Sequence, residues 1–155
     1  MSHEYTYDIS MFRDTFDTRF TYLNGFLRNV SRFGSRPALF DPHSGRRWTY
    51  RELNAEANRL AHALRADGVG KNDVVMFTLL NSPEFVFCYL AAHKIGAVAC
   101  PVNYRQGAGE IALVIDDSTP KAFIYDAEFG ELSGGALDLC ENKPAIKIVV
   151  GADDA

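Results

Sequence analysis

The sequence lacks a long hydrophobic run, a secretory leader and paired cysteines. No apolar stretch approaches the ~20 residues that a membrane-spanning helix needs. The N-terminus, MSHEYTYDIS, has no basic region followed by an apolar one, so no secretory signal is expected. The three cysteines are an odd number without CxxC spacing, which favours reduced thiols in the core. We therefore expect a cytoplasmic protein with no transmembrane segment.

Familiar catalytic motifs are also missing. There is no GxSxG, and the four histidines (His3, His43, His62 and His93) share no metal-binding spacing. The GVGK stretch at 68–71 fails as a phosphate loop, because position 65 is arginine, position 72 is asparagine, and a strand follows it rather than precedes it. We expect no catalytic residue and no metal site in this chain.

The composition is that of a globular domain, with 47% hydrophobic and 23% charged residues in a chain of 155. The net charge of −4 argues against nucleic acid as the main partner. Residues 1–71 carry 11 basic and 8 acidic side chains, or +3, whereas residues 72–155 carry 5 and 12, or −7. Arg28, Arg32 and Arg36 recur at helical spacing, either as an anion-binding stripe or, as we favour, as the solvated face of a helix.

The first 37 residues read as an aromatic-rich arm, with a helix expected over 20–33 and closed by Pro37. Two short apolar runs joined by a Pro/His/Ser/Gly turn then predict a hairpin over 38–50. We divide the chain into this arm (1–37) and a partial α/β subdomain (38–155).

From residue 49 onward, helical and strand patterns alternate. Thr49 and Glu52 form a capping box at the start of a helix that Gly68 ends, and Ser82 and Pro83 begin a second that Gly96 ends. Further helices are predicted over 110–117 and, weakly, over 126–142. Strands are predicted over 73–80, 97–102, 121–125 and 145–150, and the apolar runs of the first two are typical of buried strands. This alternation predicts an α/β fold with a doubly wound, mostly parallel sheet, left incomplete because the chain stops after a strand.

One glycine pattern suggests a dinucleotide site. Gly107 and Gly109 begin a GxGxx[GA] pattern after a strand and before a helix, and Asp126 ends the next strand 19 residues further on. Four residues separate the strand from Gly107, and the helix is short, so the tight strand-to-helix turn is lost. A small dinucleotide-binding domain using these three residues is the alternative function.

The order and spacing of several stretches resemble the adenylate-forming (AMP-dependent) synthetases and ligases. They are WTYRELNAEANRLAHALRADGVGKNDVV, NSPEFVFCYLAAHKIGAVACPVNYR and KAFIY, and the resemblance covers roughly residues 20–150. The TYREL opening of the capped helix and the KIGAV…P.N.R ending make the chain most similar to the acyl-CoA synthetases.

The resemblance implies a parent enzyme that uses ATP and Mg²⁺ to convert a carboxylic acid to an acyl-adenylate, then transfers the acyl group to coenzyme A. In this family a Ser/Thr/Gly-rich loop ending in Pro-Lys, an acidic Mg²⁺-binding segment and a lysine of a mobile C-terminal domain supply the catalytic groups. None of them occurs in these 155 residues. We therefore expect an N-terminal fragment of the ligase that is inactive alone and binds none of these cofactors tightly.

One binding residue carries over from the family. The arginine after the P.N turn can lie beside the coenzyme A channel, and the matching position here is Arg105. A guanidinium at the carboxyl end of a strand suits a phosphate, although a surface arginine paired with a local carboxylate would look the same in sequence. A third alternative is a non-catalytic interaction module, since an open sheet edge would favour a homodimer or another partner chain.

Overall fold

The computed structural model describes residues 9–151, and its first part is a helical arm. The expected helix is present as α2 (Tyr22–Phe33), with the Thr21 hydroxyl accepting the Asn24 N–H at 3.2 Å as its N-cap. Two helical segments that the sequence did not predict precede it, α1 (Ile9–Arg13) and the π-helical η1 (Asp14–Arg19). Within the described range, no helix combines the length and the apolar character needed to cross a bilayer.

The expected hairpin joins the arm to the rest of the chain. It consists of β1 (Pro37–Phe40) and β2 (Arg47–Thr49), paired antiparallel. Trp48 on β2 is buried and packs with residues of α2, α3 and α4, namely Phe26, Leu53, Ala57 and Leu90. Arg36 lies between α2 and β1, so it is not part of the helical stripe expected from the spacing of Arg28 and Arg32. Pro37 cannot continue a helix, which explains why α2 has ended before it.

The capping box predicted for helix α3 (Tyr50–Ala66) is confirmed. The Glu52 carboxylate accepts the Thr49 N–H at 2.8 Å, and the Thr49 hydroxyl accepts the Glu52 N–H at 3.3 Å. The Glu52 carboxylate also accepts the Thr49 hydroxyl at 2.8 Å, and the two hydrogen bonds that it accepts from Thr49, the backbone one first, lower the pKa of Glu52 because they favour its ionised form. Gly68, with φ of +90°, turns the chain out of the helix at the predicted place.

Four parallel strands form the sheet in the order β4-β3-β5-β6. Their bounds are β3 Val74–Thr78, β4 Val98–Pro101, β5 Ala122–Asp126 and β6 Ile146–Val150. The central strand β3 is buried almost throughout, as its continuous apolar run predicted. Residues 97–102 contain the predicted strand, β4, but the prediction that this strand is buried is wrong. β4 pairs only with β3, at an edge of the sheet, and both Val98 and Pro101 are exposed.

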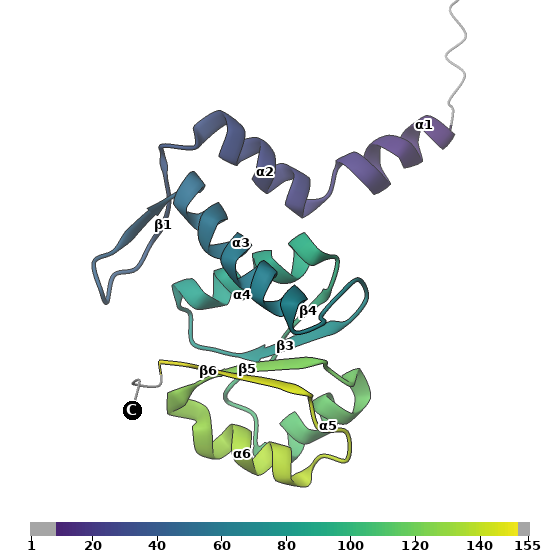
Figure 1. The fold of residues 1–155 in the computed structure, drawn as a ribbon, viewed down its shortest axis with the longest axis vertical. Helices are drawn as coiled ribbons and strands as arrows, with labels where there is room; N and C mark the ends of the chain where they lie inside the picture. The colour runs from purple at the N-terminus through teal and green to yellow at the C-terminus, as the bar shows by residue number, and fades with distance from the viewer. Residues whose placement is uncertain (1–8, 152–155) are drawn as a thin grey trace, which may run out of the picture.

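Helices cover both faces of the sheet (Figure 1). α4 (Pro83–Ile95) and α3 lie on one side, and α5 (Ala108–Ser118) and α6 (Gly130–Leu139) lie on the other, with a 3₁₀ turn η2 (Ala127–Phe129) before α6. The doubly wound α/β fold is therefore confirmed. The weakly predicted helix proves to be a full α6 despite its two glycines. A Cβ added at Gly135 would lie 3.4 Å from the Ala108 Cβ, so a glycine there allows the two helices to pack closely.

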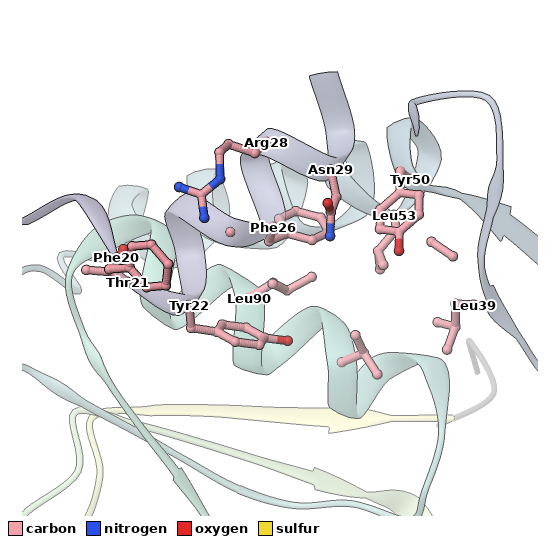
Figure 2. Close-up of a pocket in the computed structure, with 13 residues that line it drawn as sticks. Phe20, Thr21, Tyr22, Phe26, Arg28, Asn29, Leu39, Tyr50, Leu53 and Leu90 are labelled. Carbon is pink, nitrogen blue, oxygen red and sulfur yellow. The ribbon is translucent and has the colours of Figure 1, made fainter. Parts of the chain in front are cut away.

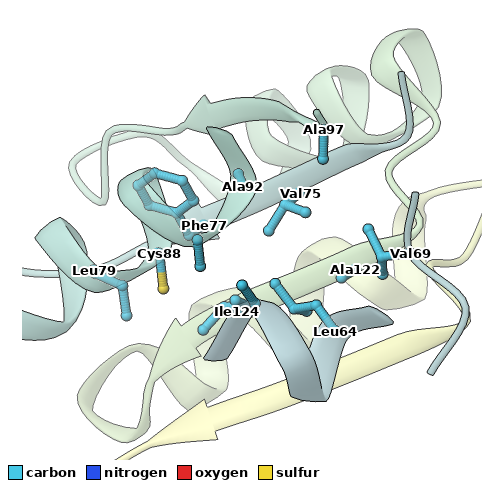
Figure 3. Packing of buried hydrophobic residues seen from close by; sticks show 12 residues of the cluster. Leu64, Val69, Val75, Phe77, Leu79, Cys88, Ala92, Ala97, Ala122 and Ile124 are labelled. Atoms are coloured by element: carbon cyan, nitrogen blue, oxygen red, sulfur yellow. The ribbon is translucent and has the colours of Figure 1, made fainter. Parts of the chain in front are cut away.

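Two buried clusters hold these layers together. Between the sheet and the α3/α4 layer lie residues from both helices and from β3 and β5, including Leu64, Val75, Phe77, Cys88, Ala92 and Ile124 (Figure 3). On the opposite face Met76 and Phe123 pack against α5 and α6, among Ile111, Ala112, Ile115 and Ala136. Residues of β3 alternate between the two clusters, so one strand supplies both cores.

Candidate functional site at the carboxyl ends of the strands

The order of the strands places a topological switch point between β3 and β5. The connection from β3 to β4 passes through α4 on one face, and the connection from β4 to β5 passes through α5 on the other. The chain therefore reverses direction across the sheet between β3 and β5, and ligands of open α/β sheets bind at the carboxyl ends beside such a switch point. Asp126, at the end of β5, accepts the Leu80 N–H at 2.7 Å and links the two strand ends.

A cavity of about 340 Å³ opens at this edge. Its lining combines the hairpin tip, the start of α4 and the turn after β4: Asp41, His43, Leu80, Asn81, Ser82, Pro83, Glu84 and Tyr104. The carboxylate of Asp41 shapes the tip by accepting the N–H groups of His43 and Ser44 at 2.9 and 3.2 Å. Its hydrogen bond with the Ser44 hydroxyl is the main cause of the lowered pKa of Asp41. The hairpin thus contributes an ionised carboxylate to this edge.

Arg105 lies in the turn after β4, next to a pair of stacked rings. The Asn103 side-chain oxygen accepts the Arg105 N–H at 3.0 Å and fixes the turn. The Arg105 guanidinium lies 5.8 Å from the centre of the Tyr104 ring, and that ring stacks on Phe129 at 4.9 Å with 8° between the planes. Arg105 is exposed and takes part in none of the ion pairs found among residues 9–151. Its charge is therefore available to an anion.

The other side chains of this edge are poorly suited to nucleophilic chemistry. Burial raises the pKa of the Cys88 thiol to about 12, and the carboxylates of Glu84 and Asp126 add to the rise. The Ser82 hydroxyl accepts the Phe85 N–H at 3.4 Å as the N-cap of α4. A neutral buried thiol and a capping hydroxyl are structural groups, so the edge can bind and orient a ligand but offers no activated nucleophile.

In the glycine pattern that begins at Gly107, the groups that would bind a dinucleotide already make hydrogen bonds within the chain. The Glu110 carboxylate accepts the Gly107 N–H at 2.8 Å, where a bound pyrophosphate would need that donor. Asp126, which would have to hold a ribose, is bound to Leu80 instead. A loop of six residues separates the end of β4 at Pro101 from the start of α5. Gly107 and Gly109 therefore belong to an ordinary helix start that a carboxylate caps.

The histidines are dispersed over the fold. His43 is exposed at the hairpin tip, and His62 is exposed on α3. His93 packs edge-on against the rings of Tyr22 and Tyr89, with ring centres at 5.7 and 4.7 Å. His3 lies outside the described residues. Between residues 9 and 151 no group of three or more histidine, cysteine, aspartate or glutamate side chains is arranged to hold a metal ion.

A larger cavity, of about 590 Å³, lies away from the strand ends (Figure 2). Its walls come from α2, β1, α3 and α4 and the residues next to them, and none comes from the four-stranded sheet. Phe26, Leu53 and Leu90 form its buried part, and Phe20 and Arg28 are on its exposed side. This cavity is a gap where α2 covers the α3/α4 layer incompletely.

Comparison with known proteins identifies the fold and its family. The family model for AMP-binding enzymes matches residues 26–155. The chain belongs to the AMP-binding enzyme family. It is 44% identical over 107 residues to a 3-hydroxybenzoate/4-hydroxybenzoate–CoA ligase of Thauera aromatica, and 42% identical over 90 residues to a long-chain fatty acid–CoA ligase of Mycobacterium tuberculosis. The structure of a fatty acyl-CoA synthetase of M. tuberculosis superposes on 85% of the chain, with a TM-score of 0.77 and 32% identity.

The chain spans only part of those relatives. The aligned segments cover 69% and 58% of the chain but 20% and 18% of the two ligases, and the superposition covers 27% of the solved synthetase. The resemblance seen in the sequence, to the N-terminal part of an acyl-CoA synthetase, is confirmed by these matches.

The sequence did not predict two parts of the carboxyl edge of the sheet. The first is the stack of Tyr104 on Phe129, which joins the turns after β4 and β5. Each ring follows the end of its strand by three residues, and this common position was the available signal. The second is the hairpin tip with Asp41 and His43, whose place beside α4 depends on tertiary packing that no local pattern encodes.

Proposed function

We propose that this chain forms the N-terminal part of an ATP-dependent acyl-CoA synthetase. Such an enzyme joins a carboxylate to the AMP moiety of ATP, releasing pyrophosphate, and then transfers the acyl group to the thiol of coenzyme A, releasing AMP. The observation that carries the proposal is the AMP-binding family match over residues 26–155, together with relatives that are CoA ligases. The carboxylic acid, ATP and coenzyme A are the expected partners, with Mg²⁺ accompanying ATP.

The contribution of this chain is scaffold and one wall of a binding site. It supplies four parallel strands and the edge on which Arg105 lies. The described residues include no cluster that suits Mg²⁺, so we assign no step of the reaction to a metal held by this chain. The loop, the acidic segment and the lysine that the family uses for adenylation are absent from the sequence, and we propose that the chain alone is inactive.

A sharp test of the activity compares this 155-residue chain with a protein that joins it to the remaining part of a CoA ligase. Carboxylate-dependent exchange of pyrophosphate into ATP is expected from the joined protein and not from the chain alone. Exchange by the chain alone would show that it holds a complete adenylation site. Saturable binding of NADH by the chain would instead support the dinucleotide alternative.

Arg105 is the residue that we propose for contact with a phosphate of coenzyme A. Its guanidinium is exposed and has no carboxylate partner in the ion pairs of the described residues, as a phosphate contact requires. The neighbouring carboxylates of Asp41 and Glu84 would repel a phosphate deeper in the cavity. These charges disfavour an anion inside the cavity and favour one at the turn that carries Arg105.

The substitution Arg105→Ala in the joined protein tests this contact. We expect the KM for coenzyme A to rise about tenfold, the loss of one charge-assisted contact of roughly 1.4 kcal/mol, and adenylation to stay unchanged. Arg65→Ala, which removes an exposed arginine of α3, is the matched control. An unchanged KM for coenzyme A in Arg105→Ala contradicts the contact but leaves the acyl-CoA synthetase proposal intact, because that proposal depends on the exchange assay.

The finer parts of the proposal concern the setting of the enzyme. We propose ATP binding, a role in fatty acid metabolism and a cytoplasmic location, the last supported by three unpaired cysteines. We keep the division into an arm (1–37) and a partial subdomain (38–155), which the start of β1 at Pro37 supports. A homodimer through the open side of β6, which pairs only with β5 among the described strands, would appear as twice the monomer mass in sedimentation.

A further inference from the structure

The turn that carries Arg105 is held together by its own hydrogen bonds. It comprises residues 103–106 of the loop between β4 and α5, and we call it the arginine turn. The Asn103 side-chain oxygen accepts the Arg105 N–H at 3.0 Å, and the Asn103 carbonyl oxygen accepts the Gln106 N–H at 3.1 Å. Among residues 9–151, no hydrogen bond or ion pair links these four residues to another element. These bonds therefore shape the turn but do not fix its place on the sheet edge.

The stack of Tyr104 on Phe129 links the arginine turn to the sheet. The two rings are half-buried and nearly parallel, with 8° between their planes and 4.9 Å between their centres. Phe129 belongs to η2, directly after β5, and β5 has a strand on each side. The Asp126 carboxylate also ties the end of β5 to the Leu80 N–H at 2.7 Å. Phe129 is thus a fixed support on which the Tyr104 ring packs.

The place of Tyr104 determines the place of the guanidinium beside it. Arg105 is the next residue in the chain, and its guanidinium lies 5.8 Å from the centre of the Tyr104 ring. A charge-assisted hydrogen bond to a phosphate depends on distance and direction. If the turn were mobile, ordering it would reduce the free energy gained on binding. A turn that the stack already holds in place avoids that loss.

We propose that Phe129 is a positioning residue for coenzyme A. Its ring holds the ring of Tyr104, and through it the guanidinium of Arg105, where a coenzyme A phosphate is bound. Phe129 acts only through this stack and needs no contact with coenzyme A itself. The inference rests on the proposed ligase function and on the Arg105 contact, and it adds a residue from a different strand end to that site.

Nuclear magnetic resonance of the 155-residue chain tests the support without any activity. We expect backbone N–H order parameters of about 0.85 for Tyr104 and Arg105 in the original chain, and below about 0.6 in Phe129→Ala. Phe129→Tyr keeps a stacking ring and should keep the original values. Phe33→Ala, which removes a half-buried phenylalanine of α2, is the matched control and should also keep them. A turn that stays rigid in Phe129→Ala, or is mobile in the original chain, overturns the proposal.

A double-mutant cycle in the joined protein tests the link to coenzyme A. Phe129→Ala should raise the KM for coenzyme A roughly threefold to tenfold, the range of one aromatic stack, and Phe129→Tyr should restore it. Arg105→Ala/Phe129→Ala should be no worse than Arg105→Ala alone, because both side chains act at one contact. The rate of pyrophosphate exchange, which needs no coenzyme A, should be the same in all these variants.

Two kinds of failure can be told apart in this cycle. An unchanged KM for coenzyme A in Phe129→Ala, or two effects that simply multiply in the double variant, overturns the role of Phe129 and leaves the ligase proposal intact. Absence of pyrophosphate exchange from the joined protein overturns the ligase proposal, and with it any role of Phe129 in coenzyme A binding.

Discussion

Removal of the Asp126 carboxylate should loosen the strand ends at the candidate site. Asp126 is the last residue of β5, and its carboxylate accepts the Leu80 N–H at 2.7 Å across the switch point. A hydrogen bond to a charged group contributes roughly 1.5–3 kcal/mol. Leu80 is 37% exposed, so water can replace part of the lost contact, and we expect the lower end of that range. Asp126→Ala should therefore reduce the free energy of unfolding by about 1–2 kcal/mol.

Two measurements on Asp126→Ala check this value. Urea denaturation followed by circular dichroism gives the change in the free energy of unfolding, and amide hydrogen exchange reports on Leu80 itself. We expect the Leu80 amide to exchange roughly tenfold faster or more, while the amides of β3 stay protected. Asp126→Asn keeps an oxygen acceptor and should lose less than half as much stability as Asp126→Ala.

The matched control is Asp138→Ala, which removes an exposed carboxylate of α6 and the same unit of charge. It should leave both the stability and the Leu80 amide unchanged. If the Leu80 amide of Asp126→Ala exchanges at the original rate, the hydrogen bond does not hold the two strand ends together, and the proposed link across the switch point is wrong.

Three further changes test the core and the turns. Phe77→Ala removes a fully buried ring that contacts Phe85 edge-on, and should cost about 3–5 kcal/mol in urea denaturation; a loss below 1 kcal/mol would contradict a packed core. Gly96→Ala places a Cβ at φ of +74° and 3.3 Å from the Lys71 Cγ, and should lower stability by about 1–2 kcal/mol. Gly130, with no atom within 4 Å of its Cβ position and a φ of −58°, should tolerate alanine. Burial raises the pKa of Cys88 to about 12, so its thiol should react with iodoacetamide at pH 8 roughly a thousandfold more slowly than an ordinary thiol. In urea it should react at the ordinary rate, and rapid alkylation of the native chain would contradict its burial.

Much of the fold was predictable because its signals are local. The Thr49–Glu52 capping box, the Ser82 N-cap and the left-handed Gly96 each end or begin a helix through contacts within a few residues. The exposure of β4 was not predictable from its amino-acid sequence, because an apolar strand can have the same composition at the edge of a sheet as in its middle. Only the crossover through α5, which carries the chain past β3 to form β5 on the other side of that strand, leaves β4 with one neighbour among the described strands.

The sequence by itself determined the α/β class, the family resemblance and the place of Arg105 after a strand. These follow from short-range periodicity, caps and the order of characteristic stretches. Only the tertiary structure decided what surrounds that arginine: the stack of Tyr104 on Phe129, the hairpin tip with Asp41, and the hydrogen bond from Leu80 to Asp126. Leu80 and Asp126 are 46 residues apart, and they meet only because parallel strands align their carboxyl ends at one edge of the sheet.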